Sequence, residues 1–396
     1  MVIEPRVLHL NTARTWRGGE RQVWFLARGL QERGIPQWIV GLPGSELEQR
    51  ARDAGLPFYG IKMRGEWDYF AVRKLRAFIG RENLNILHAH TSRAHGLGLM
   101  TVAKLPRTRL IVSRRVDFPA GRNYLSRRKY LSPRIATYIA ISENVQRVLL
   151  ADGVPENKIR IAYSGIDLNR FAPLTGDAAR ASVARMAALR SEFGLPEPDN
   201  GDAHGPVVIG NVAALVDHKD QATLLNALAR LNAGDGPTNK NFVCLIFGAG
   251  ELQAALEKQA RDLGLLNRSV FFAGFRDQID DAYRLFDIFV MSSKEEGLGT
   301  AVLDAMGFSL PVAAARGGGI PEMIVDGEGG YLSPVGDAAA LAENLQRLLE
   351  SNELRARFGA YNRKRVERFS HQATCETTLR IYRDVLAAKP TTTGGL

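Results

Sequence analysis

The chain has 396 residues, 45% hydrophobic and 24% charged, a composition typical of a globular protein with two domains. No apolar run approaches the roughly 20 residues that would cross a bilayer, and two isolated cysteines, Cys244 and Cys375, exclude a disulfide framework and a cysteine zinc site. The net charge of +10 divides into +15 for residues 1–170 and −5 for the remainder, so we expect the first half to face an anionic partner.

Short apolar runs alternate with stretches of helical period along the chain, a pattern typical of βαβ units and parallel sheets. In the first half we predict a helix near 23–30 and strands at 6–11, 37–42, 85–90, 109–113 and 136–141. In the second half the predicted strands are 207–210, 243–247, 270–272, 288–291 and 311–313. The fold class is therefore α/β, with two Rossmann-like domains that each contain a doubly wound parallel sheet.

Changes in composition set the predicted boundaries. The first domain covers 1–171, a linker with a helix near 180–193 covers 172–205, and the second domain covers 206–370. The final segment, 371–396, has helical spacing followed by a Thr/Gly tail, and we expect its helix to cross back to the first domain. The first residues lack the basic and apolar segments of a signal peptide, which predicts a cytoplasmic protein.

The segment that follows the predicted strand 288–291 has the pattern of a phosphate site. Glycines permit a tight turn after the strand, and a helix begins near Thr300. The first-turn amides of a helix and its positive dipole end favour phosphate oxygens. We therefore expect a diphosphate at the backbone of Gly297, Leu298, Gly299 and Thr300, between the carboxylates of Glu296 and Asp304. The alternative is a solvated Glu296 and an Asp304 that only complements the helix dipole.

A lysine occupies the corresponding place after another strand. Lys219 follows the strand 207–210 and precedes a helical stretch, 221–231, at the carboxyl edge of the predicted sheet. Ligands of open α/β sheets collect at that edge. Taken alone, a lysine there is more often an ordinary surface residue, so its meaning depends on the rest of the pattern.

Many short motifs occur in one order along the chain. They are Gly18-Gly19-Glu20, His88-Ala89-His90, Ser164-Gly165-Ile166-Asp167, Lys219-Asp220, Phe247-Gly248-Ala249-Gly250, Phe272-Ala273-Gly274-Phe275, Glu296-Gly297-Leu298-Gly299 and Gly319-Ile320-Pro321-Glu322. This succession resembles glycosyltransferase family 4 nearly from end to end. The resemblance implies a GT-B fold, in which two Rossmann-like domains face a cleft, and retaining transfer of a sugar from a nucleotide-diphosphate donor.

The resemblance also implies roles for residues of the second domain. Lys219 would neutralise the donor diphosphate, which the turn 297–300 would bind through its backbone. Glu296 would bind hydroxyls of the transferred sugar, and Asp304 would bind the ribose. The backbone at Gly274 and Phe275 would lie beside the nucleobase.

In the first domain, the resemblance places Gly18 and Gly19 against the diphosphate and His90 beside the transferred sugar. With Lys219 and Glu296, His90 completes the candidate catalytic set. His88 is interpreted as a structural residue of its strand. The reaction implied by the family needs neither a metal nor a cofactor beyond the donor substrate.

Two positions depart from the family pattern. The second acid of the E-x7-E motif is Asp304, one methylene shorter than the usual glutamate, and Ala214 stands where an arginine usually precedes the lysine. Arg17 and Arg316 are candidate substitutes for that missing cation.

A basic segment interleaved with aromatic residues follows the predicted strand 109–113. It contains Arg114, Arg115, Arg127, Arg128 and Lys129 with Phe118, Tyr124 and Tyr130. This pattern suits an anionic membrane surface or a phosphorylated glycan acceptor, and the alternative is a solvated surface helix. Nucleic acid is not expected, because the basic residues follow no nucleic-acid module.

The sequence thus predicts a glycosyltransferase that acts on a glycan or lipid-linked acceptor, in lipopolysaccharide or surface-polysaccharide synthesis. We expect it in the cytoplasm or on the inner face of the membrane. The alternatives are a GT-B sugar-nucleotide epimerase and a non-catalytic, degenerate module that only binds the sugar nucleotide.

Overall fold

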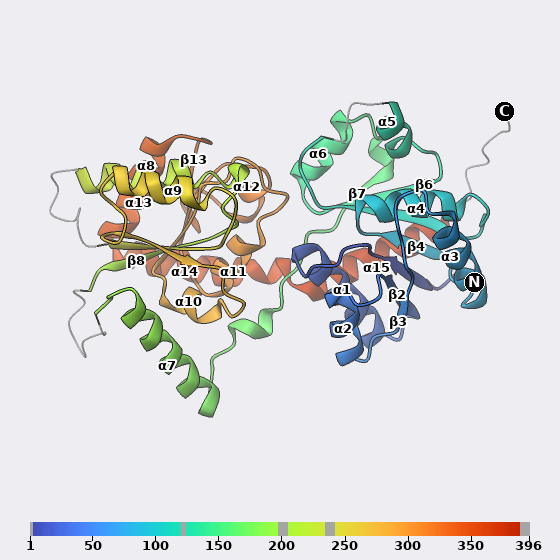
Figure 1. Cartoon of the computed structure of the whole chain (residues 1–396), viewed down its shortest axis with the longest axis horizontal. Coiled ribbons are helices and arrows are strands. Elements are labelled where there is room, and N and C mark those ends of the chain that lie inside the picture. Colours follow the sequence, from blue (N-terminus) through green and yellow to red (C-terminus); the bar gives the residue numbers. More distant parts are fainter. Residues whose placement is uncertain (1–2, 120–123, 197–204, 234–241, 389–396) are drawn as a thin grey trace. The chain divides into compact units, whose positions relative to one another are not determined.

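The computed structural model of the chain describes residues 3–119, 124–196, 205–233 and 242–388. Two compact units divide the chain: Met1–Gly165 together with Phe369–Leu396, and Ile166–Arg368 (Figure 1). Each unit has a parallel sheet with helices packed against it, so the predicted α/β class with two doubly wound sheets is confirmed.

The first unit contains a seven-stranded sheet in the order β3-β2-β1-β4-β5-β6-β7. Its strands are β1 (Val7–Leu10), β2 (Gln37–Gly41), β3 (Phe58–Gly60), β4 (Ile86–Ala89), β5 (Arg109–Arg114), β6 (Ile135–Ala140) and β7 (Ile159–Ile161). Its helices are α1 (Gly18–Glu32), α2 (Glu46–Asp53), α3 (Tyr69–Arg81), α4 (Ser92–Val102), α5 (Tyr124–Tyr130), α6 (Glu143–Ala151) and α15 (His371–Ala387). The chain order reverses between β1 and β4, which makes this the place where an open sheet admits a ligand.

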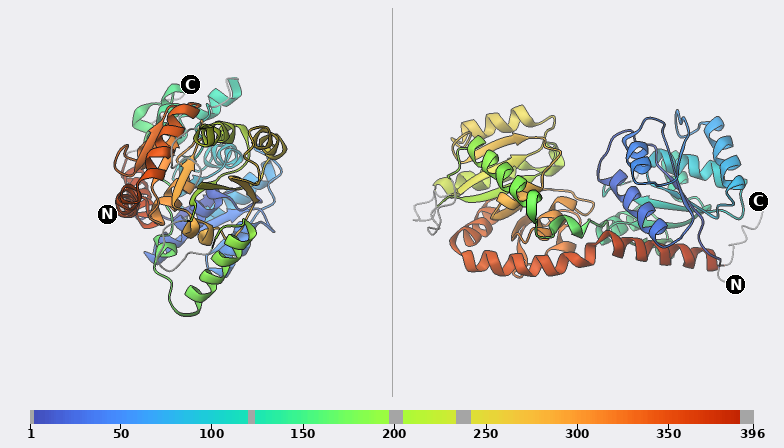
Figure 2. Two further views of the ribbon diagram at one scale, coloured as in Figure 1. Left: turned by 90° about the vertical axis from the view of Figure 1, so that its left-hand side faces the viewer. Right: turned by 90° about the horizontal axis from the view of Figure 1, so that it is seen from below.

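The C-terminal helix α15 packs against the sheet of the first unit and against α1 (Figure 2). Val7, Ile86 and Ile111 come from three adjacent strands and share one apolar core with Leu379 and Tyr382 of α15. All five are nearly inaccessible to solvent, and each fully buried aliphatic side chain contributes about 1.5–3 kcal/mol. The last described residues of the chain therefore help to build the first unit.

The second unit contains a six-stranded sheet in the order β10-β9-β8-β11-β12-β13. Its strands are β8 (Val207–Val212), β9 (Phe242–Phe247), β10 (Val270–Gly274), β11 (Ile288–Met291), β12 (Val312–Ala315) and β13 (Gly330–Ser333). Its helices are α7 (Gly176–Glu192), α8 (Gln221–Ala233), α9 (Gln253–Asp262), α10 (Asp280–Leu285), α11 (Thr300–Gly307), α12 (Ile320–Met323), α13 (Ala338–Glu350) and α14 (Asn352–Arg365). The chain order reverses between β8 and β11, which again marks the expected ligand edge.

The described part of the expected linker is an element of the second unit. Its helix α7 packs on α10, where Ser182 and Arg185 both bind the buried carboxylate of Asp281. A separate finding concerns membranes: among the described residues, every helix is too short or too polar to cross a bilayer.

Candidate functional site

The second unit brings its predicted site residues together at the switch between β8 and β11. These two strands are parallel neighbours, so the segments after them leave the sheet at the same edge. Lys219 ends a short 3-10 helix after β8, and Glu296 lies in the turn after β11. The Lys219 ammonium and the Glu296 carboxylate form an ion pair.

The hydroxyls of two serines that directly follow β11 hold this pair in place. Ser292 donates to the backbone carbonyl of Lys219 at 3.1 Å, and Ser293 donates to Oε1 of Glu296 at 3.2 Å. The side chains of Lys219 and Glu296 are only 16% and 10% exposed. The structure thus holds one cation and one anion, each with a little solvent access, at the ligand edge of the sheet.

The turn between Glu296 and α11 has the geometry that the sequence predicts. Gly299 lies in the left-handed region at φ +94°, directly before Thr300 begins α11. The amides of a helix's first turn have no partner within the helix, and they point along its positive dipole end. Leu298 is 2% exposed, so its side chain belongs to the core and only its backbone is suited to a ligand.

A glycine loop after β12 supports the backbone of Glu296. Gly319 donates its N–H to the carbonyl of Glu296 at 2.8 Å. Gly318 has φ +54°, and a Cβ at this position would lie 2.0 Å from the same carbonyl. A side chain there would displace Glu296, which explains the glycine before the Gly319-Ile320-Pro321-Glu322 motif.

Asp304, the predicted ribose ligand, already has a protein partner. Its Oδ1 accepts a hydrogen bond from Nη1 of Arg170 at 2.7 Å, and the residue is 7% exposed. Arg170 also binds Asp280. Burial alone would lower the pKa of Arg170, but the two carboxylates raise it above its usual value. Arg170 has no role among the motifs of the sequence, and its pairing with Asp304 arises from the fold.

The predicted nucleobase segment lies at the end of edge strand β10. Gly274 has φ +67°, and its carbonyl accepts from the N–H of Gly248 at 2.9 Å, which joins this segment to the loop after β9. Phe275 is 70% exposed. An exposed ring at the carboxyl edge of the sheet can stack on a planar base.

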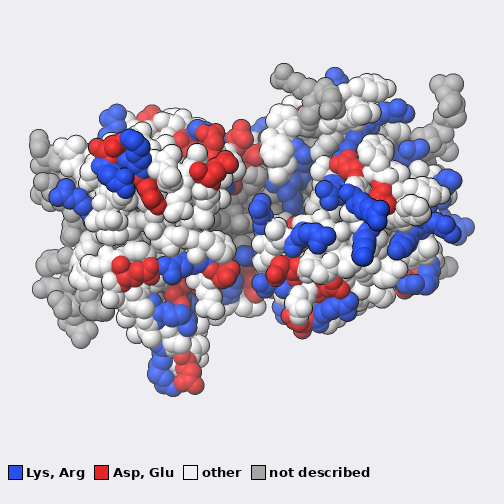
Figure 3. Space-filling view, in the orientation of Figure 1, with Lys and Arg blue, Asp and Glu red and all other residues white. Residues whose placement is uncertain are grey.

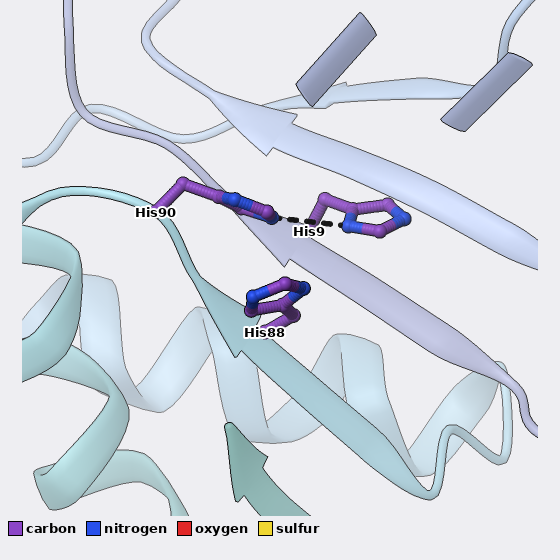
Figure 4. A group of neighbouring side chains, drawn as sticks. All are labelled: His9, His88 and His90. Atoms are coloured by element: carbon purple, nitrogen blue, oxygen red, sulfur yellow. Dashed lines mark hydrogen bonds between the residues drawn. The ribbon is translucent and has the colours of Figure 1, made fainter. Parts of the chain in front are cut away.

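In the first unit, His9, His88 and His90 lie at the corresponding switch between β1 and β4 (Figure 4). His9 Nδ1 and His90 Nε2 are 3.1 Å apart, while Nη2 of Arg115 lies 3.3 Å from His90 Nδ1. Burial lowers the pKa of His9 to about 3 and the pKa values of His88 and His90 well below 6.5. All three rings are therefore neutral at pH 7.

The hydrogen bonds from Arg115 to His90 and from His90 to His9 determine the tautomers of both histidine rings. Arg115 can only donate, so His90 accepts at Nδ1 and carries its proton at Nε2. His90 then donates to Nδ1 of His9, whose proton lies on Nε2, a buried atom without a hydrogen-bond partner among the described residues. Nothing in the local sequence indicates this role for His9 or Arg115, because strand order brings them close to His90.

The three histidines have ligand atoms within 4.8 Å of one another, the spacing of a metal site. Both nitrogens of His88 are engaged, with the Tyr382 hydroxyl at 2.6 Å and the Ser113 hydroxyl at 2.8 Å. Both nitrogens of His90 are also engaged, and the Arg115 cation lies beside it. The described arrangement therefore favours a hydrogen-bond network over metal ligation.

Gly18 and Gly19 begin α1 at the same edge of the first sheet. A Cβ on Gly18 would meet no atom within 4 Å, and one on Gly19 would lie 3.8 Å from Arg115 Cδ. Glu20 accepts from the backbone N–H of Arg17 at 3.0 Å and thereby caps the helix start. The open backbone here is suited to close approach of a ligand.

Comparisons with known proteins agree with this arrangement of motifs. Residues 16–170 match the model of glycosyltransferase family 4, and residues 197–365 match that of the glycosyl transferases group 1. A lipopolysaccharide core biosynthesis glycosyltransferase of Rhizobium meliloti is 33% identical, with 94% of this chain and 96% of the relative covered. The chain belongs to glycosyltransferase family 4. It is therefore a glycosyltransferase, and the predicted enzyme class is confirmed.

Solved structures show the fold of this family 4 chain. A glycosyltransferase from Rickettsia africae superposes with a TM-score of 0.81 at 19% identity, covering 98% of this chain and all of the other. Anabaena Alr3699/HepE, solved in complex with UDP, gives 0.79 at 20% identity, covering 96% and 100%. The predicted GT-B fold is confirmed.

The arginine that the family pattern leads us to expect is replaced by Ala214, whose carbonyl accepts from the side chain of Gln221 at 3.0 Å. Of the two candidate substitutes, Arg316 forms an ion pair with Asp326, and both side chains are about half exposed. Arg17 is exposed at the start of α1. Within the second unit, Arg316 is therefore engaged with Asp326 rather than with the Lys219 pair.

Exposure differs among the five cations of the predicted contact set in the basic segment. Arg114 is 7% exposed and binds the Tyr130 hydroxyl and the Phe118 carbonyl, while Arg115 is largely buried beside His90. Lys129 is paired with Glu66. These three cations have partners within the first unit, whereas the side chains of Arg127 and Arg128 are exposed.

Proposed function

We propose that this glycosyltransferase moves a sugar from a nucleotide-diphosphate donor, such as a UDP or GDP sugar, to a glycan or lipid-linked acceptor. We further propose that the transfer retains the anomeric configuration and serves lipopolysaccharide or surface-polysaccharide synthesis in the cytoplasm. The observation that carries the proposal is the Lys219–Glu296 pair beside the start of α11, at the switch point of the second sheet.

Each partner of the pair suits one part of the donor. Cleavage of a glycosyl phosphate bond develops negative charge on the leaving diphosphate, and a prearranged cation and helix amides stabilise that charge most in the transition state. Lys219 and the first turn of α11 supply such groups. Glu296 supplies a hydrogen-bond acceptor for sugar hydroxyls.

The ion pair also explains how the site is held before the donor arrives. Lys219 and Glu296 neutralise each other at a position with little solvent, where an unpaired charge would be costly. A donor would offer phosphate oxygens to the lysine and hydroxyls to the glutamate. The pair would then exchange one set of partners for another without leaving either charge unsatisfied.

Retention is proposed through a front-face displacement, in which the leaving phosphate accepts the proton of the acceptor hydroxyl. This mechanism requires no protein nucleophile, and we draw no step through a metal. In the first unit, His90 is proposed to lie beside the transferred sugar and Gly18–Gly19 to approach the diphosphate. His90 would contribute as a neutral hydrogen-bonding group, since its pKa is lowered by burial.

The relatives support the substrate class. The Rhizobium meliloti relative is named for lipopolysaccharide core biosynthesis, and the Anabaena protein has been solved with UDP-glucose as well as UDP. No relative described above is named as an epimerase or a binding module, so the comparisons do not favour those alternatives.

A thermal-shift screen of nucleotide diphosphates and their sugars tests the proposal. A ligand at 100 times its dissociation constant adds about 2.7 kcal/mol to the free energy of unfolding. We expect one base to stabilise the chain, and its sugar nucleotide to release free nucleotide diphosphate when acceptor glycolipid is added. Binding without release would indicate the non-catalytic module, and conversion of the donor to its epimer would indicate the epimerase.

A further inference from the structure

Arg115 lies at the ligand edge of the first unit. It directly follows β5, the strand that pairs with β4. Its Nη2 lies 3.3 Å from Nδ1 of His90, and a Cβ on Gly19 would lie 3.8 Å from its Cδ. The side chain of Arg115 therefore lies beside both the end of β4 and the start of α1, where an open sheet admits a ligand.

The positive charge of Arg115 has no acidic partner among the described residues. Its one hydrogen-bond partner there is the neutral ring of His90. Its Nε is enclosed without a partner, whereas Nη1 also lacks a partner but reaches solvent. Glu20 is the acid whose charge acts on Arg115, but its two oxygens accept from the Asn11 side chain at 3.4 Å and from the backbone N–H of Arg17 at 3.0 Å. The described part of the first unit thus leaves this cation unpaired.

Packing within the first unit does not account for this unpaired charge. Arg114, the preceding residue, binds the Tyr130 hydroxyl and the Phe118 carbonyl, so its partners belong to the fold. Burial lowers the pKa of Arg115 to about 10, so the group is still charged at pH 7, at a place where an unpaired charge is costly. A buried donor that the fold leaves unsatisfied indicates a partner from outside the fold.

The space open to such a partner lies at the glycine turn. The cavity that Arg115 lines with Gln22, His88 and Ser164 has a volume of about 20 Å³, which is room for one water. A Cβ on Gly18, by contrast, would meet no atom within 4 Å. The first-turn amides of α1 have no partner within the helix. A larger anion is therefore excluded from the cavity and admitted at the turn.

We infer that Arg115 binds a phosphate group of a substrate at this edge of the first unit. Its planar guanidinium presents N–H groups in a fork that fits phosphate oxygens. Residues 1–170 have a net charge of +15, and lysines and arginines are prominent on the face of the first unit in Figure 3, so the surrounding field also favours an anion. This role rests on the proposed function, because the donor and a phosphorylated acceptor both offer such a group.

Arg115→Gln tests this role, with Arg6→Gln as the matched control. Arg6 directly precedes β1, at the opposite edge of the same sheet, and it also has neutral partners, the carbonyls of Glu82 and Asn83. One arm of the experiment measures affinity for inorganic diphosphate and for the nucleoside diphosphate found by the thermal-shift screen. The other arm measures affinity for extracted core glycolipid before and after its phosphates are removed. We expect Arg115→Gln to weaken binding in one arm by at least about 10-fold, the loss expected for a hydrogen bond to a charged group, and Arg6→Gln to weaken neither.

The two arms distinguish the sources of the phosphate. A loss with both diphosphates assigns Arg115 to the donor, whereas a loss confined to the phosphorylated glycolipid assigns it to the acceptor. Arg115→Lys keeps the charge without the fork and should recover part of the lost affinity. A role confined to orienting His90 would instead lower kcat and leave both affinities unchanged.

Three results would overturn this role for Arg115. The first is native affinity of Arg115→Gln in both arms, and the second is an equal loss in Arg115→Gln and Arg6→Gln. The third is a larger fall in melting temperature for Arg115→Gln than for Arg6→Gln, which would show that the fold itself needs the cation. Both arms measure binding alone, so a native chain that binds these ligands without sugar transfer would refute the proposed function and still report on Arg115.

Discussion

Replacing Lys219 by alanine removes the cation of the ion pair and leaves the Glu296 carboxylate with Ser293 as its remaining side-chain partner among the described residues. The Glu296 side chain is only 10% exposed, so water replaces the lost ammonium poorly. Leaving a largely buried charge with an incomplete set of partners costs about 2 kcal/mol here. For a unit of this size, we expect the melting temperature of the second unit to fall by about 4–8 °C.

The effect of Lys219→Ala on turnover should be larger than its effect on folding. The lysine would oppose charge that develops only as the diphosphate leaves, and loss of one such group costs about 100-fold or more in turnover. The assay is release of nucleotide diphosphate from the donor found by the thermal-shift screen, measured well below the melting temperature of the variant.

Lys294→Ala is the matched control for this prediction. Lys294 lies on the loop that carries Glu296 and pairs with Asp217 at 3.4 Å, but its side chain is 41% exposed. We expect it to lower neither the melting temperature nor turnover appreciably, since exposed ion pairs contribute about 0–1 kcal/mol. Near-normal turnover of Lys219→Ala, or equal losses in the two variants, would refute the role assigned to Lys219.

Three further predictions follow from the geometry. By chemical unfolding, Gly318→Ala should destabilise the second unit by about 2 kcal/mol more than Gly327→Ala. Both glycines have positive φ, but only Gly318 faces the Glu296 carbonyl. Equal losses of stability in the two variants would contradict this contact. The pKa of His9 is about 3 in the folded chain and 6.5 when unfolded, so the unfolded chain binds the extra proton. As pH drops from 6.5 towards 3, His9 alone should lower the free energy of unfolding by about 1.4 kcal/mol per pH unit, in addition to the contributions of His88 and His90. His9→Gln should therefore make the measured slope shallower by about that amount, and an unchanged slope would contradict the buried neutral His9. If Asp304 binds ribose, Asp304→Asn should weaken the binding of nucleoside diphosphates but not of inorganic diphosphate, as measured by calorimetry. If Asp304 only pairs with Arg170, the variant and the native chain should bind both ligands with equal affinity.

Strand periodicity predicted the centre of each sheet and one edge strand, β10, but missed the other three edge strands. The predicted strands correspond to β1, β2, β4, β5 and β6 and to β8 through β12. The three missed strands, β3, β7 and β13, all lie at a sheet edge and have only three or four residues. A short edge strand is paired on one side only, so it lacks the continuous apolar run that marks a central strand.

Sequence motifs predicted the residues of the proposed donor site but not their partners in the folded chain. Lys219 and Glu296 belong to separate motifs, and the pairing of β8 with β11 brings them together. Nothing in the local sequence indicated that Asp304 would bind Arg170, because the two lie 134 positions apart.

The same limit applies to the basic segment. Spacing alone treated five cations as one surface, whereas Arg114 and Lys129 find partners in the interior of the first unit.

The anomeric configuration of the transferred sugar tests the central claim most directly. With the donor found by the thermal-shift screen and an extracted core glycolipid as acceptor, nuclear magnetic resonance of the product reports the new glycosidic bond. We predict that the sugar keeps the configuration it had in the donor and that Lys219→Ala and Glu296→Gln both suppress the product. An inverted linkage would contradict the front-face mechanism, and normal product formation by both variants would contradict the proposed donor site.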